Sequence, residues 1–210
     1  MAILEDIVLA IEKGDKASVG ELTQKAVSEG IVATEILDNG LIAGMNVVGE
    51  KFKNNEVFIP EVLMSARAMK AGMGIVRPLL AEANIESKGN IVIGTVKGDF
   101  HDIGKNIVGM LLEGAGYQII DLGADVSVEQ FMGVVEKDGA NVIGMSALLT
   151  TTMTYMKEVI QAVDDAGLKD KVKVIIGGAP ITQSYADEIN ADGYAPDAAK
   201  AVDLVKGLLG

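Results

Sequence analysis

His101 is the sole histidine of this 210-residue chain, and it lies in a loop where it could bind a metal. The loop reads Gly98-Asp99-Phe100-His101-Asp102-Ile103-Gly104 and follows an apolar, β-branched run. Asp99, two residues before the histidine, can accept the imidazole Nδ1–H, which fixes the tautomer and leaves Nε2 available to a metal. Gly104 allows the chain to turn into the next helix with close backbone approach.

A conventional zinc or iron site needs two or three more strong ligands. The chain has no second histidine and no cysteine, which also excludes disulfides, iron–sulfur clusters and thiol catalysis. Two interpretations of His101 therefore remain open at this point. It is either a surface-loop histidine without a ligand, or the one protein ligand of a metal that brings its own macrocycle.

Two further loops carry patterned small residues. The first is Ser146-Ala147-Leu148-Leu149-Thr150-Thr151-Thr152, which offers hydroxyl groups and a leucine suited to an aromatic base. The second is Gly177-Gly178-Ala179-Pro180, whose glycines leave room for a bulky group to pass close to the backbone.

The elements that position these loops alternate between β-branched runs and helical periodicity after residue 89. Five β-α units of this kind predict an α/β flavodoxin-like (Rossmann-like) doubly wound parallel sheet, whose ligands bind beyond the carboxyl ends of the strands. The predicted strands are Asn90 to Val96, Gln118 to Asp121, Val142 to Met145, Val172 to Ile176 and Gly193-Tyr194. The predicted helices are Gly104 to Ala115, Val128 to Lys137, Thr152 to Ala166, Tyr185 to Ile189 and Ala198 to Leu208.

The first part of the chain has helical periodicity and predicts a small four-helix bundle. The expected helices are Ala2 to Lys13, Asp15 (as N-cap) to Glu29, Val32 to Lys53, and a helix beginning after Ile59 that runs to Ala83. Pro78 should kink or break the last of these. We therefore expect two domains, residues 1–86 and 90–210, joined by a linker at 86–90 that could act as a hinge.

Composition narrows the class of protein. The net charge of −12 repels nucleic-acid backbones, and aromatics at 4% disfavour a stacking platform for single strands. The chain shows no secretory signal and no apolar run of membrane-spanning length. The expectation is a cytoplasmic protein that binds neither nucleic acid nor a membrane.

Taken together, Asp99-x-His101-x-x-Gly104, Ser146-x-Leu148 and Gly177-Gly178 resemble the three-part signature of base-off/His-on cobalamin-binding domains. The spacing fits as well, since 41 residues (105–145) separate the first two parts and 28 (149–176) the last two. With the bundle in front, the chain resembles the corrinoid proteins of methanol, methylamine and methoxylated-aromatic methyltransferase systems. Three ordered motifs at set distances are far more specific than any one of them.

The resemblance implies a cobalamin or related corrinoid as cofactor, with His101 as the lower axial cobalt ligand and Asp99 as its hydrogen-bond partner. A hydroxyl that backs the aspartate falls on Thr152, where serine is more familiar. The other implied roles are a pocket for the detached lower base (Ser146, Leu148, Thr150), space for the nucleotide tail (Gly104, Gly177, Gly178), and neighbours of the corrin or tail (Gly98, Asp102, Ile103, Tyr194, Ala195). Met64, Met69 and Met73 could shield the upper face from the bundle or simply fill its core.

The implied function is that of a methyl carrier, non-catalytic alone. The cofactor would accept a methyl group from a substrate held by a substrate-specific methyltransferase. A second methyltransferase, acting on a pterin or thiol acceptor, would then receive it, and a reductive activator could serve as a further partner. The alternatives are a cobalamin-binding sensor or regulatory module and a mutase-type coenzyme-binding subunit. A cofactor-free receiver domain would want a phosphorylatable aspartate after the third strand, where this chain has Ser146.

Overall fold

The computed structural model describes residues 2–83 and 87–210 of the chain. The chain divides into two compact units, which we call the helical unit (chiefly residues 1–87) and the sheet unit (chiefly residues 88–210). Glu86, the first residue of the expected linker, lies outside the described residues. Each unit is described by itself below.

The helical unit begins with two helices, α1 (Ala2–Glu12) and α2 (Lys16–Ser28). The predicted N-cap is confirmed, because the Asp15 carboxylate accepts a hydrogen bond from the Ser18 amide at 3.1 Å. The last helix, α5 (Ile59–Glu82), continues through Pro78, so the alternative of a break there was wrong. Val76 and Leu80 on either side of the proline are buried, and their packing holds the helix together across the missing hydrogen bond.

The predicted helix from Val32 to Lys53 consists of α3 (Ala33–Ile36), the π-helical turn η1 (Leu37–Ile42) and α4 (Ala43–Lys53) in direct succession. Gly44 serves packing, because a Cβ there would lie 2.9 Å from the Ile11 Cβ and would push this helix away from α1. A Cβ on Gly40 would lie 3.4 Å from the Ile7 Cγ2, which is an ordinary contact.

The sheet unit contains the five predicted strands, all parallel, in the order β2-β1-β3-β4-β5. This is the flavodoxin-like order, so the predicted fold class is confirmed. The strands are β1 (Asn90–Thr95), β2 (Gln118–Asp121), β3 (Val142–Ser146), β4 (Lys173–Gly177) and β5 (Gly193–Ala195). The helices are α6 (Ile103–Gly114), α7 (Val128–Asp138), α8 (Tyr155–Asp165), α9 (Gln183–Glu188) and α10 (Ala198–Leu209).

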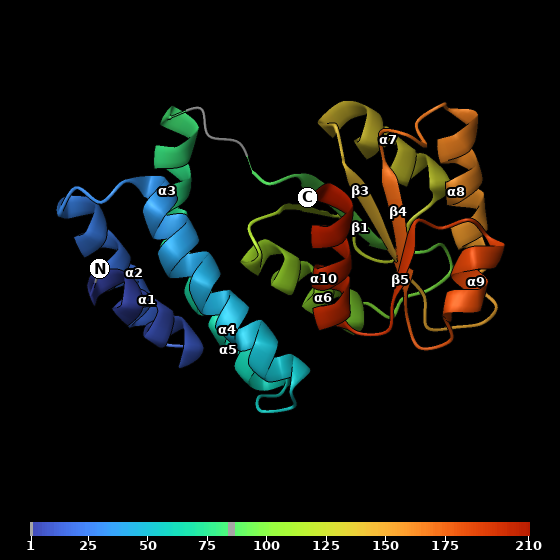
Figure 1. The fold of residues 1–210 in the computed structure, drawn as a ribbon. Helices are drawn as coiled ribbons and strands as arrows, with labels where there is room; N and C mark the ends of the chain where they lie inside the picture. The colour runs from blue at the N-terminus through green and yellow to red at the C-terminus, as the bar shows by residue number, and fades with distance from the viewer. Residues whose placement is uncertain (1, 84–86) are drawn as a thin grey trace. The chain divides into compact units, whose positions relative to one another are not determined.

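The sheet lies between two layers of helices, with α7, α8 and α9 on one face and α6 and α10 on the other (Figure 1). Alternate strand residues serve the two faces, as the pleat requires. Val92, Ile143 and Val174 join one buried cluster with side chains of α7, α8 and α9. Phe131 of α7 is fully buried in it, and a Cβ on Gly94 would lie only 2.7 Å from its ring, so the glycine allows α7 to pack against β1.

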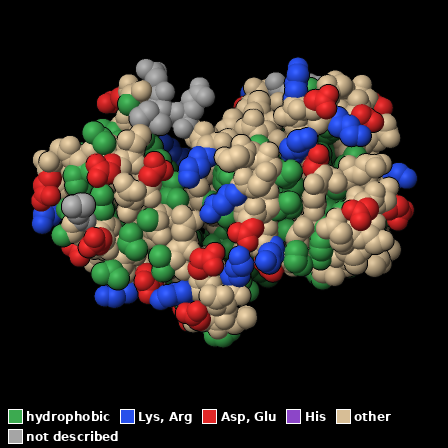
Figure 2. Space-filling view, in the orientation of Figure 1, with side chains coloured by type: hydrophobic (Ala, Val, Ile, Leu, Met, Phe, Trp, Pro, Cys, Tyr) green, Lys and Arg blue, Asp and Glu red, His purple; other side chains and the backbone are tan. Residues whose placement is uncertain are grey.

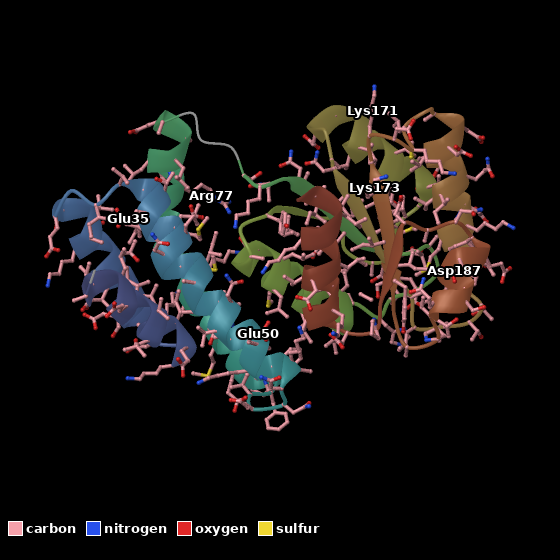
Figure 3. All side chains as sticks on the ribbon, viewed as in Figure 1. Glu35, Glu50, Arg77, Lys171, Lys173 and Asp187 are labelled. Carbon is pink, nitrogen blue, oxygen red and sulfur yellow. The ribbon has the colours of Figure 1, made fainter. Side chains whose placement is uncertain are left out.

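Charged side chains lie on the outer surfaces of both units, interspersed with hydrophobic ones on the face drawn in Figure 2. Glu35 and Glu50 of the helical unit are exposed, as are Lys171 and Asp187 of the sheet unit (Figure 3). None of the helices in the described residues is long and apolar enough to cross a membrane.

Candidate cofactor site

The three sequence motifs meet at the carboxyl edge of the sheet. Thr95 at the end of β1 pairs with Ser146 of β3, Ser146 pairs with Gly177 of β4, and Gly177 pairs with Ala195 of β5. These four residues form one row across neighbouring strands. The strand order reverses between β1 and β3, and it is at such a switch point that doubly wound sheets bind their ligands.

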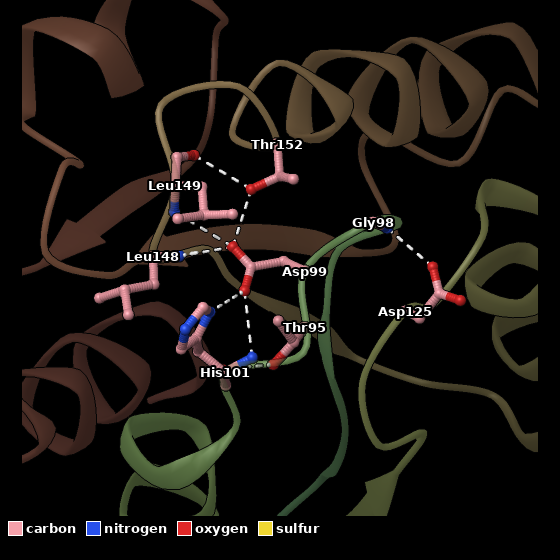
Figure 4. A network of polar contacts seen from close by, with 8 residues as sticks. All are labelled: Thr95, Gly98, Asp99, His101, Asp125, Leu148, Leu149 and Thr152. Atoms are coloured by element: carbon pink, nitrogen blue, oxygen red, sulfur yellow. Dashed lines mark hydrogen bonds and ion pairs between the residues drawn. The ribbon is translucent and has the colours of Figure 1, made fainter.

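The carboxylate of Asp99 is the centre of a hydrogen-bond network between the loops after β1 and β3 (Figure 4). Its Oδ1 lies 2.8 Å from Nδ1 of His101 and accepts the His101 backbone N–H at 3.1 Å. Its Oδ2 accepts the backbone N–H groups of Leu148 at 2.8 Å and Leu149 at 3.1 Å. The Asp99–His101 contact that the two-residue spacing predicted is therefore present.

Thr152 completes this network from the turn before α8. Its Oγ1 lies 2.7 Å from Asp99 Oδ2 and 3.0 Å from the Leu149 carbonyl oxygen. A hydroxyl has one proton, and the shorter contact to a charged acceptor is the stronger bond. The hydroxyl thus donates to the carboxylate.

Asp99 is fully buried, yet its environment favours the charged form. Burial alone raises the pKa of a carboxyl, but here the hydrogen bonds from Thr152, His101 and the Leu148 amide outweigh it, and the pKa of Asp99 lies well below its ordinary value. An ionised carboxylate accepts and does not donate, so the Nδ1 that faces it carries a proton. In the tautomer of the neutral ring that has this proton, Nε2 carries the lone pair.

The imidazole itself is open to solvent, with 53% of the His101 side chain exposed. Large apolar side chains flank it: Phe100 is 72% exposed and Ile103 74% exposed, and Leu148 across the network is also exposed. Water makes such exposure unfavourable, and several exposed large apolar side chains in two neighbouring loops indicate a binding surface. A flat, largely apolar partner with one electrophilic centre would suit this surface.

Gly177 and Gly178 bring the loops after β3 and β4 close together. A Cβ on Gly178 would lie 1.9 Å from the Ala147 carbonyl oxygen, and the residue has φ +129°. A Cβ on Gly177 would lie 3.1 Å from the Ala195 carbonyl oxygen. The close approach of backbone to backbone therefore requires glycine at position 178 and leaves a side chain at position 177 crowded, before any ligand is considered. By contrast, nothing lies within 4 Å of a Cβ built on Gly104, which is exposed in the first turn of α6.

The remaining predicted residues line the same edge without joining the Asp99 network. Ser146 and Tyr194 are half-buried, Ala195 is buried, and Thr150 is exposed. The half-buried Asp102 accepts a hydrogen bond from Nδ2 of Asn106 at 3.1 Å. Gly98 donates its backbone N–H to Asp125.

Sequence reasoning missed the ion pair behind the histidine loop. The buried Lys105 places its Nζ 2.5 Å from Oδ1 of Asp121 and 2.6 Å from Oδ1 of Asn106. It ties the first turn of α6 to the end of β2. A lysine on the buried face of an amphipathic helix was the available signal, since buried charges need a partner.

The protein groups at this site fit a metal whose cofactor already supplies most of its ligands. Within residues 2–83 and 87–210, no three His, Cys, Asp or Glu side chains gather where they could hold an ion between them. One oriented imidazole, an open ring and an apolar rim are what a macrocyclic metal cofactor requires. The residues present therefore fit such a group.

Comparisons with known proteins agree with this geometry. Two models described as B12 binding domains match the chain, one over residues 89–203 and the other over residues 3–77. A corrinoid protein of Desulfitobacterium hafniense is 47% identical over 100% of this chain and 99% of its own length. The dimethylamine corrinoid protein of Methanosarcina barkeri is 45% identical over 99% of this chain and 97% of its own length.

Among solved structures, a chain of the methanol:cobalamin methyltransferase complex from Methanosarcina barkeri matches with a TM-score of 0.90 and 33% identity. The match covers 99% of this chain and 80% of that one.

Proposed function

The chain belongs to the family of B12-binding corrinoid proteins and its cofactor is a corrinoid, and we propose that it carries methyl groups between methyltransferases with His101 as the lower axial ligand of the cobalt. The observation that supports this most directly is the 2.8 Å contact between Nδ1 of His101 and Oδ1 of Asp99. It leaves the second nitrogen of a half-exposed ring with its lone pair. The nucleotide base of the cofactor would be displaced from the metal, the base-off/His-on mode.

The protein's contribution is to orient the imidazole and to hold the proton of its Nδ1 on the side of Asp99. Asp99 accepts the Nδ1 proton and is itself fixed by Thr152 and by the amides of Leu148 and Leu149. Because the ionised carboxylate increases the basicity of the ring it faces, the network tunes how firmly His101 binds the metal. Cobalt in the corrin supplies the chemistry, as an atom that accepts a methyl group and gives it up.

Apolar side chains of the two loops would cover the lower face of the corrin. Phe100, Ile103 and Leu148 are exposed in the loops of the His101–Asp99 network and would be buried by a bound macrocycle. Ser146 and Thr150 would line the pocket for the displaced base. Gly104, which has open space where a side chain would lie, would let the tail pass close to the start of α6.

The helical unit would act as a cap over the upper face, with domains at residues 1–86 and 90–210. The B12-binding model that matches residues 3–77 supports its connection with the cofactor. Of the three methionines considered, Met69 is buried in the bundle core and Met64 is 52% exposed. Met64 is therefore the better candidate for contact with the cofactor, and Met69 serves packing.

The relatives support a set of protein partners. Methylamine corrinoid proteins and a methanol:cobalamin methyltransferase complex are among them. We propose a substrate-specific methyltransferase as the donor partner and a second methyltransferase with a pterin or thiol acceptor. A reductive activator would return oxidised cobalt to the active state. Relatives named corrinoid proteins over the whole chain favour this function over a sensor module or a mutase subunit.

Reconstitution with hydroxocobalamin tests the proposal. The wild-type protein should retain the cofactor through gel filtration with the visible spectrum of histidine-ligated cobalamin. The His101→Ala variant should bind more weakly and show the spectrum of cobalamin without a nitrogen base. A wild-type protein that retains no chromophore would overturn the function. Identical spectra for both proteins would overturn the role of His101.

Transfer is tested with the cobalamin-loaded protein and one candidate methyltransferase at a time. Methylamines and methanol are the first donors to try, given the relatives. The expected result is a change of the bound cofactor's spectrum that needs the protein, the methyltransferase and the donor together. If the spectrum never changes with any donor class, the carrier function is contradicted even though the cofactor binds.

A further inference from the structure

The loop between β2 and α7 braces the loop that carries His101. The Thr95 amide donates to the Gly123 carbonyl at 2.9 Å, and the Val126 amide donates to the Thr95 carbonyl at 3.0 Å. Val96 and Val126 form a parallel bridge beyond the end of the β1–β2 ladder. The two loops thus stay paired past the point where the strands end.

Asp125 makes the two outermost contacts of this brace. Its Oδ1 accepts the Gly98 backbone N–H at 2.7 Å, and its own backbone N–H donates to the Asp99 carbonyl at 3.0 Å. Asp125 has φ +57° and Gly98 has φ +79°. A non-glycine residue in the left-handed region is uncommon, and aspartate is among the few that adopt it readily.

Asp125 holds the backbone at Gly98 and Asp99, whereas Thr152 holds the Asp99 side chain; Figure 4 draws the bond from Gly98 to Asp125 and that from Thr152 to Asp99. The Asp99 side chain is fixed by the loop after β3, while its main chain is fixed by the loop after β2. His101 follows two residues later and takes both its ring contact and its amide contact from Asp99. Any displacement of Asp99 therefore moves the imidazole.

We propose that Asp125 is a positioning residue for His101, acting through Gly98 and Asp99 to set the strength of the cobalt–histidine bond. This rests on the proposed axial ligation. Asp125 is exposed and does not belong to the three-part motif, so its role follows from the brace alone. Its hydrogen bonds to this loop go to the Gly98 amide and the Asp99 carbonyl, so its effect on the imidazole is indirect.

Two substitutions separate the side-chain contact from the backbone conformation. Asp125→Gly keeps the positive φ but removes the acceptor for Gly98. Asp125→Asn keeps both, because asparagine also adopts the left-handed region and its amide oxygen accepts a hydrogen bond. Any difference between the two variants reports the Gly98 contact.

The first measurement uses the protein without cofactor. Amide hydrogen exchange followed by NMR should show the His101 N–H, which donates to Asp99, exchanging about fivefold faster in Asp125→Gly, the change in an opening equilibrium expected from one lost hydrogen bond. Asp125→Asn should restore the wild-type rate. Unchanged exchange at His101 in Asp125→Gly would show that the brace does not reach the histidine, and would overturn the proposal.

The second measurement uses the hydroxocobalamin-loaded protein and the midpoint potential of its Co(II)/Co(I) couple. An axial histidine stabilises the more oxidised metal, so a loosened His101 should make the potential less negative. Fivefold weaker ligation corresponds to about 40 mV for a one-electron couple. Asp125→Gly should show this shift and Asp125→Asn should not. The potential of His101→Ala, which has no histidine to bind the cobalt, gives the largest shift that loss of ligation can produce.

The outcomes distinguish axial ligation by His101 from the positioning role of Asp125. If His101→Ala has the wild-type potential, axial ligation fails, and the exchange data still decide whether Asp125 positions the loop. If His101→Ala shifts the potential and Asp125→Gly does not, the function stands and Asp125 is only a surface contact.

Discussion

Thr152 Oγ1 donates a hydrogen bond to Asp99 Oδ2 at 2.7 Å, although 53 residues separate the two in the chain. The bond joins the turn before α8 to the loop after β1 and has its acceptor on a fully buried carboxylate. Every contact of His101 with Asp99 depends on that carboxylate staying in place and charged. The hydroxyl is therefore part of the apparatus that orients the imidazole.

Replacing Thr152 by valine keeps the shape of the side chain and removes the hydroxyl. A buried carboxylate that loses one donor should destabilise the fold by about 2 kcal/mol, as for hydrogen bonds to charged groups. Thr152→Ser keeps the hydroxyl and should lose well under half of that. Urea unfolding of the cofactor-free proteins measures both. Equal losses for serine and valine would mean that the methyl group, and not the hydroxyl, matters here.

The pH dependence of stability should carry the signature of Asp99. Its pKa is lowered in the folded protein, so the folded state binds fewer protons than the unfolded state wherever Asp99 titrates. Its contribution is then fully present above the ordinary aspartate value of about 3.9 and is lost progressively as the pH falls below it.

The Asp99→Asn variant isolates this contribution. The asparagine nitrogen would face amide donors, so the variant should be less stable by about 3 kcal/mol near neutral pH, from several bonds to a charged acceptor. The gap between wild type and variant should be constant above about pH 5 and narrow as the pH falls below 4, since other carboxyls titrate in both proteins. A gap that widens on acidification would contradict the lowered pKa.

The strands and the Asp99–His101 contact were predictable because both are local. Short β-branched runs identify β1 to β4, and the aspartate lies two positions before the histidine in the same loop. The strand order then follows from the flavodoxin-like pattern. Residues at strand ends, such as Ser146 and Gly177, fall into one row without further information.

Contacts between loops were not predictable from the same patterns. Asp125 reaches Gly98 across 27 residues, and Leu149 reaches Asp99 across 50, through loop conformations that no periodicity encodes. The start of α8 was placed three residues early for a related reason. The Thr152 hydroxyl lies against the Leu149 carbonyl and Asp99, and such side-chain bonding favours turns over helix.

The buried ion pair behind the loop predicts an asymmetry between its two partners. The Lys105 side chain is 2% exposed, and that of Asp121 is 43% exposed. Asp121→Asn leaves a buried ammonium without its charged partner and should cost about 3 kcal/mol. Lys105→Met leaves a carboxylate that water can still reach, so it should cost clearly less.

Chemical denaturation of the cofactor-free protein compares the two variants directly. We predict a larger loss of unfolding free energy in Asp121→Asn than in Lys105→Met, and the reverse order would refute this prediction. The spectrum of the cobalamin-loaded variants adds a second comparison. Because Lys105 lies in the first turn of α6, four residues after His101, Asp121→Asn should also weaken histidine ligation.

Glycine-to-alanine changes at two motif positions should separate folding from cofactor binding. In Gly178→Ala, a Cβ 1.9 Å from the Ala147 carbonyl oxygen must move backbone, and φ +129° adds strain, so the variant should lose about 3 kcal/mol or more of stability.

In Gly104→Ala, the Cβ meets open space in a helical turn, so stability should be unchanged or rise by up to about 1 kcal/mol. If the cofactor's tail passes close to Gly104, the same variant should bind hydroxocobalamin at least tenfold more weakly while remaining as stable as wild type. Thermal unfolding without cofactor and equilibrium binding with it give the two numbers for each protein. Wild-type affinity in Gly104→Ala would remove Gly104 from the tail site, because nothing in its own fold requires a glycine there.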